Sequence, residues 1–90
     1  MLRRVWMKAD AKTMWKPKVE EYIYSDGSIW YSFRDSNGRP HNVENFDEAQ
    51  KIIAQYHMID ITDRVYNSGW IHPDIYRDVV KQRDAERKES

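Results

Sequence analysis

Acidic side chains gather in the middle of this 90-residue chain. Residues 19–63 hold nine Asp and Glu against three Lys and Arg, a net charge of −6. Turns and the start of a helix are sites where local structure stabilises carboxylates, partly through the helix dipole. A negative surface also attracts a basic groove on another protein and speeds association with it. The acids that we expect to form such a partner-binding surface are Asp35, Glu44, Asp47 and Glu48.

Basic side chains gather at the N-terminus. Residues 1–18 hold six Lys and Arg against one Asp, a net charge of +5, although the whole chain is neutral. Lys and Arg neutralise phosphates and Trp stacks on bases, so nucleic-acid binding is the alternative function. Its candidate residues are Arg3, Arg4, Lys8, Trp30, Arg34 and Arg39. The other interpretation of this segment is a strand with solvated lysines and with Trp6 and Trp15 in the core, where most aromatic residues pack.

The sequence carries no signal for catalysis or for a cofactor. It has no GxSxG, no glycine-rich phosphate loop and no HExxH. It has no cysteine, which excludes disulfides, thiolate zinc sites and cysteine nucleophiles. His57, Asp60 and Asp63 follow a three-residue spacing, but a zinc site needs a further strong ligand. We expect a non-enzymatic protein that uses no metal and no cofactor.

Membrane and export signals are also lacking. No apolar run approaches the ~18–20 residues of a membrane helix. The N-terminus has no long apolar segment of the kind that a secretory signal requires. We expect a cytoplasmic protein with no membrane contact.

Two turn signals predict an antiparallel sheet. Residues 19–25 and 28–35 favour strands, and Asp26-Gly27 between them predicts a two-residue type I′ turn, which needs two positive φ angles. In that register the predicted core face consists of Tyr22, Tyr24, Ile29, Tyr31 and Phe33.

The next turn extends the sheet to a third strand. Ser36-Asn37-Gly38 predicts a three-residue loop with Gly38 in the left-handed region, and that register sets Tyr31 opposite Val43. Pro40 cannot donate to a ladder, so this strand is predicted to be an edge. Residues 3–9 alternate weakly and predict one further strand.

A helix is predicted over residues 47–57. Asp47 is its expected N-cap, with Gln50 closing a capping box. Its apolar residues follow the helical spacing i, i+3, i+4, i+7 and are Ala49, Ile52, Ile53 and Tyr56. We expect this stripe to pack on the aromatic sheet face.

A second helix is predicted from Pro73, because proline suits the first helical position. Ile59 and Ile61 alternate with acids and predict a short strand before it, which Asn67-Ser68-Gly69 brings to an end. The predicted fold is therefore α+β, an antiparallel meander of three or four strands packed on one helix, with a second helix at the C-terminus. Residues 1–83 are expected to form one domain and residues 84–90 an exposed, fraying tail.

One local pattern resembles known DNA-binding domains. The stretch from Asp26 to Pro40, followed by residues 45–49, is similar to the three-stranded sheet plus helix of AP2-type domains and of the arm-binding domains of tyrosine integrases. Those families read the DNA major groove with the sheet face away from the helix. The resemblance implies that Trp30, Ser32, Arg34 and Arg39 would lie near DNA. Acids in the same region repel phosphates, so we rank DNA binding second.

The leading expectation is a small binding protein that acts by protein–protein contact. Its size, its lack of motifs and its separated charges are similar in kind to small accessory proteins of phages and mobile elements, which often inhibit host or defence enzymes. The expected partner is therefore a host or defence protein. The alternative is a small DNA-binding regulator or an integrase-arm-type module.

Overall fold

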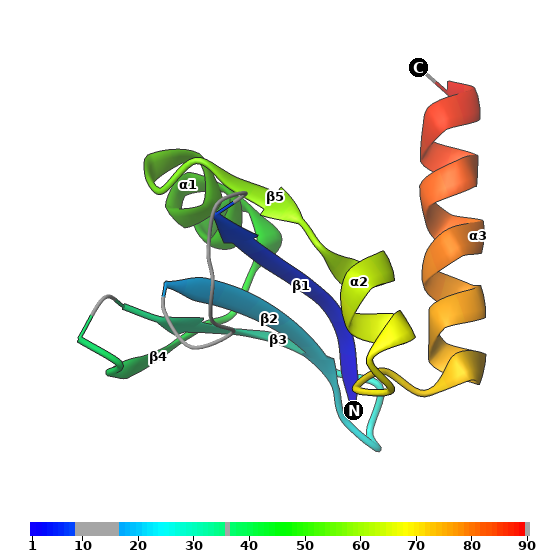
Figure 1. Cartoon of the computed structure of the whole chain (residues 1–90), viewed down its shortest axis with the longest axis horizontal. Coiled ribbons are helices and arrows are strands. Elements are labelled where there is room, and N and C mark those ends of the chain that lie inside the picture. Colours follow the sequence, from blue (N-terminus) through cyan, green and yellow to red (C-terminus); the bar gives the residue numbers. More distant parts are fainter. Residues whose placement is uncertain (9–16, 36, 90) are drawn as a thin grey trace.

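The computed structural model describes residues 1–8, 17–35 and 37–89, with residues 87–89 described by their backbone alone. Figure 1 shows a twisted antiparallel sheet with helices on both sides, which confirms the predicted α+β class. The sheet has five strands in the order β4-β3-β2-β1-β5. These strands are β1 (Leu2–Lys8), β2 (Lys18–Ile23), β3 (Ile29–Arg34), β4 (Pro40–Val43) and β5 (Met58–Asp60). The helices are α1 (Phe46–Gln55), α2 (Thr62–Asn67) and α3 (Pro73–Glu89).

The turn between β2 and β3 differs from the predicted two-residue type I′ turn. The backbone N–H of Tyr24 donates to the carbonyl of Ser28 at 2.9 Å, which leaves three residues in the loop. Gly27 has φ +87°, whereas Asp26 is not in the left-handed region. The Asp26 carboxylate instead accepts the backbone N–H of Ser28 at 2.9 Å. A type I′ turn needs positive φ at both central residues, so this loop cannot be one.

The longer loop shifts the predicted register by one residue. Glu21, and not Tyr22, lies opposite Tyr31, while Tyr22 lies opposite Trp30. A one-residue shift moves side chains to the other face of a sheet. The placement of Tyr22 and Tyr24 on the same face as Tyr31 is therefore wrong.

The second turn follows its prediction. Tyr31 lies opposite Val43, Gly38 has φ +82°, and β4 forms an edge of the sheet. Ser36 of the predicted loop lies outside the described residues. The strand predicted over residues 3–9 is also present, as β1 between β2 and β5.

Helix α1 packs on one face of the sheet, as predicted. Its N-cap is Asn45, whose Oδ1 accepts the backbone N–H of Glu48 at 2.9 Å. The predicted N-cap at Asp47 is wrong, because Asn45 already has the extended backbone and the side-chain oxygen that a cap requires. The buried core on this face consists of Trp6, Val19, Tyr31, Phe33, Ala49 and Met58, with the other stripe residues of α1 packed at its margin.

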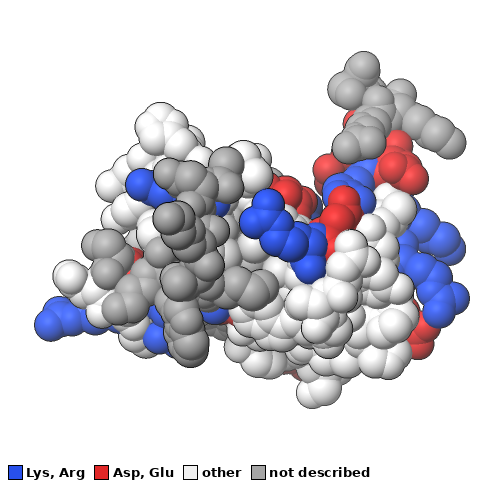
Figure 2. Space-filling view, in the orientation of Figure 1, with Lys and Arg blue, Asp and Glu red and all other residues white. Residues whose placement is uncertain are grey.

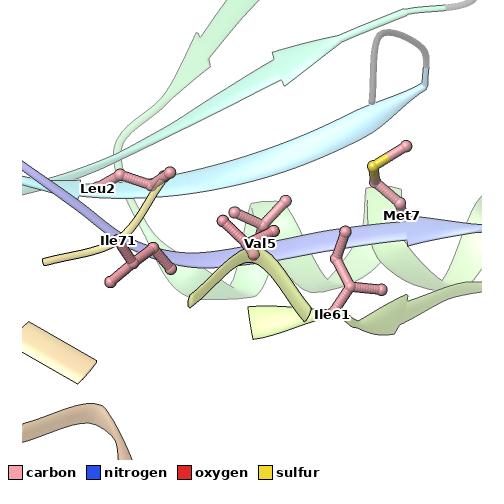
Figure 3. Close-up of a cluster of buried hydrophobic side chains, with 6 residues drawn as sticks. Leu2, Val5, Met7, Ile61 and Ile71 are labelled. Carbon is pink, nitrogen blue, oxygen red and sulfur yellow. The ribbon is translucent and has the colours of Figure 1, made fainter. Parts of the chain in front are cut away.

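The opposite face of the sheet has a second core. Figure 3 shows Leu2, Val5 and Met7 of β1 together with Ile61 and Ile71, which flank α2. Val65 of α2 completes the buried cluster. Tyr22 and the first turn of α3 both pack against this cluster. Helix α2 was not predicted, because six residues are too few to show a helical period.

Two of the remaining C-terminal predictions are confirmed, because residues 58–60 form a short strand and α3 begins at Pro73. The predicted end of that strand at Asn67-Ser68-Gly69 is wrong, because β5 ends at Asp60 and α2 lies between it and Gly69, which has φ +84°. In Figure 1 the second half of α3 extends beyond the sheet. Within the described ranges, no helix combines the length and the apolar character that crossing a membrane would require.

Candidate protein-binding surface

The structure places the four predicted partner-binding acids at two ends of the sheet. Asp35 follows β3 and begins the turn into β4, whereas Glu44 follows β4 at the other end of the same pair of strands. Asp47 and Glu48 come directly after it, in the first turn of α1. Three of the four acids therefore lie together, and Asp35 lies apart from them.

Asp35 has a local structural role. Its Oδ1 accepts the backbone N–H groups of Arg39 and Asn37, each at 2.9 Å, and its Oδ2 lies 3.1 Å from Nε2 of His41. These hydrogen bonds, that of Arg39 above all, lower the pKa of the Asp35 carboxyl. The turn itself thus accounts for an acid at this position.

The other three acids have no such engagement. The side chains of Glu44, Asp47 and Glu48 are all exposed. None of the three forms an ion pair with a residue in the described part of the chain. Three carboxylates are therefore presented to solvent at the junction of β4 and α1.

Two large aromatic residues are exposed at the same end of the sheet. Tyr24 is 52% exposed and Trp30 is 36% exposed, and both line a hollow of about 470 Å³ beside the β2–β3 turn. The Asp26 carboxylate also lines this hollow, and hydrogen bonds from Ser28 lower its pKa. We call this region the acidic–aromatic end, defined by Tyr24, Asp26, Trp30, Glu44, Asp47 and Glu48. Tyr24 was not predicted as a surface residue, because the predicted register placed it in the core.

The two N-terminal arginines of the nucleic-acid alternative are built into the fold. Arg4 donates from Nε to Glu21 Oε1 at 3.0 Å and from Nη2 to Glu21 Oε2 at 2.7 Å. Although burial acts to lower it, the pKa of Arg4 is raised by the hydrogen bonds and charge of Glu21. Arg3 is buried and donates to Gln82 Oε1 at 2.6 Å. Trp6 belongs to the core beside α1, as the structural interpretation of this segment predicts, whereas Trp15 lies outside the described residues.

The other basic candidates do not converge. Lys8 ends β1, Arg39 lies exposed after the β3–β4 turn, and Arg34 donates to the carbonyl of Gly38 at 2.9 Å. The sheet face away from α1 is the one that the resemblance assigns to DNA, and its β1 portion packs against α2. Figure 2 shows Lys and Arg side chains along the outer side of α3, on the other side of the molecule from α1.

Buried carboxylates occupy both faces of β2 without forming a pair. Glu21 accepts the Tyr31 hydroxyl at 2.6 Å on the α1 side, and Glu20 accepts the Tyr22 hydroxyl at 3.0 Å on the other. Burial, together with the neighbouring glutamate, raises the pKa of each of these two tyrosines to about 12. Two carboxylates on opposite faces cannot act on one substrate.

The described part of the chain also offers no cluster of three His, Cys, Asp or Glu side chains that could hold a metal ion. His57 lies in the left-handed region at φ +53°. Asp60 accepts hydrogen bonds from Thr62, and Asp63 accepts them from Tyr76 and Arg83. Asp60 and Asp63 therefore hold neighbouring turns and helices in place through these hydrogen bonds.

Comparison with known proteins found no matching protein-family model, no matching curated protein and no matching solved structure.

Proposed function

We propose that this chain is a small non-enzymatic binding protein that docks on a basic surface of another protein through its acidic–aromatic end. One observation carries the proposal: three exposed carboxylates lie at the same end of the sheet as the exposed rings of Tyr24 and Trp30. Acids steer the approach of a basic partner. Tyr and Trp are the residue types that most often anchor an interface once it has formed.

Hydrogen bonds and ring packing at this end support the role. Asn45 fixes the start of α1, and Phe46 packs its ring 5.6 Å from Tyr31 and 5.9 Å from Trp6. Ser28 holds Asp26 through its backbone N–H and its hydroxyl. Asp47 and Glu48 thus stand on a capped and packed helix and Asp26 in a hydrogen-bonded turn, which lowers the entropy cost of binding. The partner in this proposal is a host or defence protein, by analogy in kind with small accessory proteins of phages and mobile elements.

The test compares capture of proteins by three forms of the tagged chain. The acidic variant carries Glu44→Gln, Asp47→Asn and Glu48→Gln, and the matched basic variant carries Lys8→Gln and Arg39→Gln. All five side chains are exposed, so each variant should melt close to the wild type. Arg3 and Arg4 are unsuitable as controls because their replacement would disturb the fold.

We expect proteins that the wild type and the basic variant retain from a lysate to be lost by the acidic variant and by Trp30→Ala. A gel shift on mixed-sequence DNA runs in parallel. If the chain binds that DNA, if the basic variant weakens binding and if the acidic variant tightens it, the DNA-binding alternative replaces this proposal. Equal capture by all forms would also overturn it.

A further inference from the structure

We propose that the hollow beside the β2–β3 turn is a binding pocket for a single arginine side chain. The hollow is lined by Tyr24, Ser25, Asp26, Ser28, Trp30 and Asn42. The inference rests on the proposed function in one respect, because it assigns that arginine to the protein partner. The pocket itself can be tested without the partner.

The two aromatic walls of the pocket lie on one face of the sheet. Trp30 is paired with Tyr22 across β2 and β3, and Tyr24 is two residues beyond Tyr22. Side chains two residues apart in an extended chain lie on the same side, so Tyr24 projects next to Trp30. Both rings are exposed, and an aromatic face attracts a cation that lies within about 6 Å of its centre.

The other described tryptophans show how this protein uses such rings. The guanidinium of Arg4 lies 5.1 Å from the centre of the Trp6 ring, and the ammonium of Lys18 lies 4.7 Å from that of Trp70. Trp30 has no cation over its ring from any residue in the described ranges. The indole that lines the hollow is therefore open to a cation from outside the chain.

Negative charge stands beside the open ring. Asp26 uses Oδ1 for both hydrogen bonds from Ser28, and neither bond involves Oδ2. Glu44 follows Val43, the residue opposite Tyr31, so the chain leaves β4 at the same end of the sheet as Trp30.

An ammonium can lie over a ring beside a carboxylate, as Lys18 does with Trp70 and Glu20. A guanidinium, however, is planar, so it can stack flat on the ring and direct two N–H groups to the carboxylate at the side. The combination of ring and carboxylate thus favours arginine over lysine.

The experiment titrates the full chain with the blocked tripeptide acetyl-Gly-Arg-Gly-amide, followed by the NMR signals of the tryptophan indole N–H groups. The Trp30→Ala spectrum assigns the signal of Trp30. A citrulline peptide keeps the planar shape without the charge, and a lysine peptide keeps the charge without the shape. Ile29→Ala is the matched control, because Ile29 directly precedes Trp30 on the same strand and faces the other side of the sheet.

We expect the arginine peptide to shift the Trp30 signal and the citrulline peptide to leave it unchanged. Trp30→Ala should weaken binding roughly 3- to 30-fold, the range of a cation–π contact. Asp26→Asn keeps the acceptor that the turn needs and should also weaken binding, whereas Ile29→Ala should not. Equal shifts from the citrulline or the lysine peptide would overturn the assignment, as would shifts at Trp70 instead of Trp30.

The peptide titration and the capture experiment test the two proposals separately. If the acidic variant loses its captured proteins while the arginine peptide shifts nothing, the protein-binding function stands and the arginine pocket is wrong. If the peptide binds at Trp30 while every form captures the same proteins, the pocket stands and the proposed function is wrong.

Discussion

Arg4 forms a bidentate ion pair with Glu21 inside the fold, with Nε 3.0 Å from Oε1 and Nη2 2.7 Å from Oε2. The Glu21 side chain is only 2% exposed, and its Oε2 also accepts the Tyr31 hydroxyl at 2.6 Å. One carboxylate therefore links β1, β2 and β3. Arg4, a candidate phosphate ligand in the sequence, therefore has a structural role between strands.

Replacing Glu21 with Gln should cost about 3–5 kcal/mol of the free energy of unfolding, because it removes the buried carboxylate and leaves the half-buried Arg4 guanidinium without its counter-charge. Urea titration at neutral pH measures this loss. Asp74→Asn is the control, since Asp74 pairs with Arg77 at 2.7 Å but both side chains are more than 70% exposed. An exposed pair contributes little, so that change should stay within about 0.5 kcal/mol. Equal losses from the two variants would contradict the structural role of Glu21.

The buried tyrosines predict that stability falls in strong alkali. Burial, and then Glu21, raises the pKa of Tyr31 to about 12, whereas an unfolded tyrosine ionises near 10. Between these values the folded state binds more protons than the unfolded state, so the free energy of unfolding falls as pH rises from about 10 to 12 and is unaffected below that window. Urea titrations across this range should show a shallower fall for Tyr31→Phe than for the wild type. Identical slopes would show that Tyr31 is not the group responsible.

The outline of the fold could be predicted from local chemistry. Gly38 fixed the second turn because a three-residue loop needs one left-handed residue, and that turn set the correct pairing of Tyr31 with Val43. Pro73 marked the start of α3, and the apolar spacing of residues 49–56 identified the buried side of α1. Each of these signals lies within a few residues of the structure that it specifies.

The incorrect predictions concern features that depend on contacts between residues far apart in the sequence. The sequence Asp26-Gly27 permits either a two-residue or a three-residue loop, and only the longer one sets Val19 opposite Phe33 in the core beside α1. That register exposes Tyr24 and makes the hollow with Trp30, so the candidate pocket could not be predicted once the turn was misassigned. The ion pair of Arg4 was equally hidden, because Glu21 lies on another strand.

The N-cap of α1 gives a test of a single side chain. Asn45→Ala removes the oxygen that accepts the Glu48 N–H at 2.9 Å, and it should cost about 1 kcal/mol. Asn45→Asp retains a capping oxygen and should cost much less. Asp47→Ala should have a small effect, since Asp47 lies inside the helix and does not cap it. Thermal unfolding of the three variants measures this order, and a larger effect at Asp47 than at Asn45 would reverse the assignment.

Two truncations of α3 should differ sharply. Removing residues 84–90 takes away exposed side chains at 84–86 and keeps Gln82 and Arg83, so the melting temperature should change by less than about 2 °C. Removing residues 81–90 also deletes the Gln82 oxygen, which accepts Arg3 Nη2 at 2.6 Å, and the Arg83 guanidinium, 3.2 Å from Asp63. Arg3 is buried, so losing its acceptor should cost about 1–3 kcal/mol, or about 4–8 °C for each kcal/mol in a domain of this size.

Gln82→Ala in the full chain should reproduce most of that loss. If the shorter truncation lowers the melting temperature as much as the longer one, the last turns of α3 belong to the folded domain.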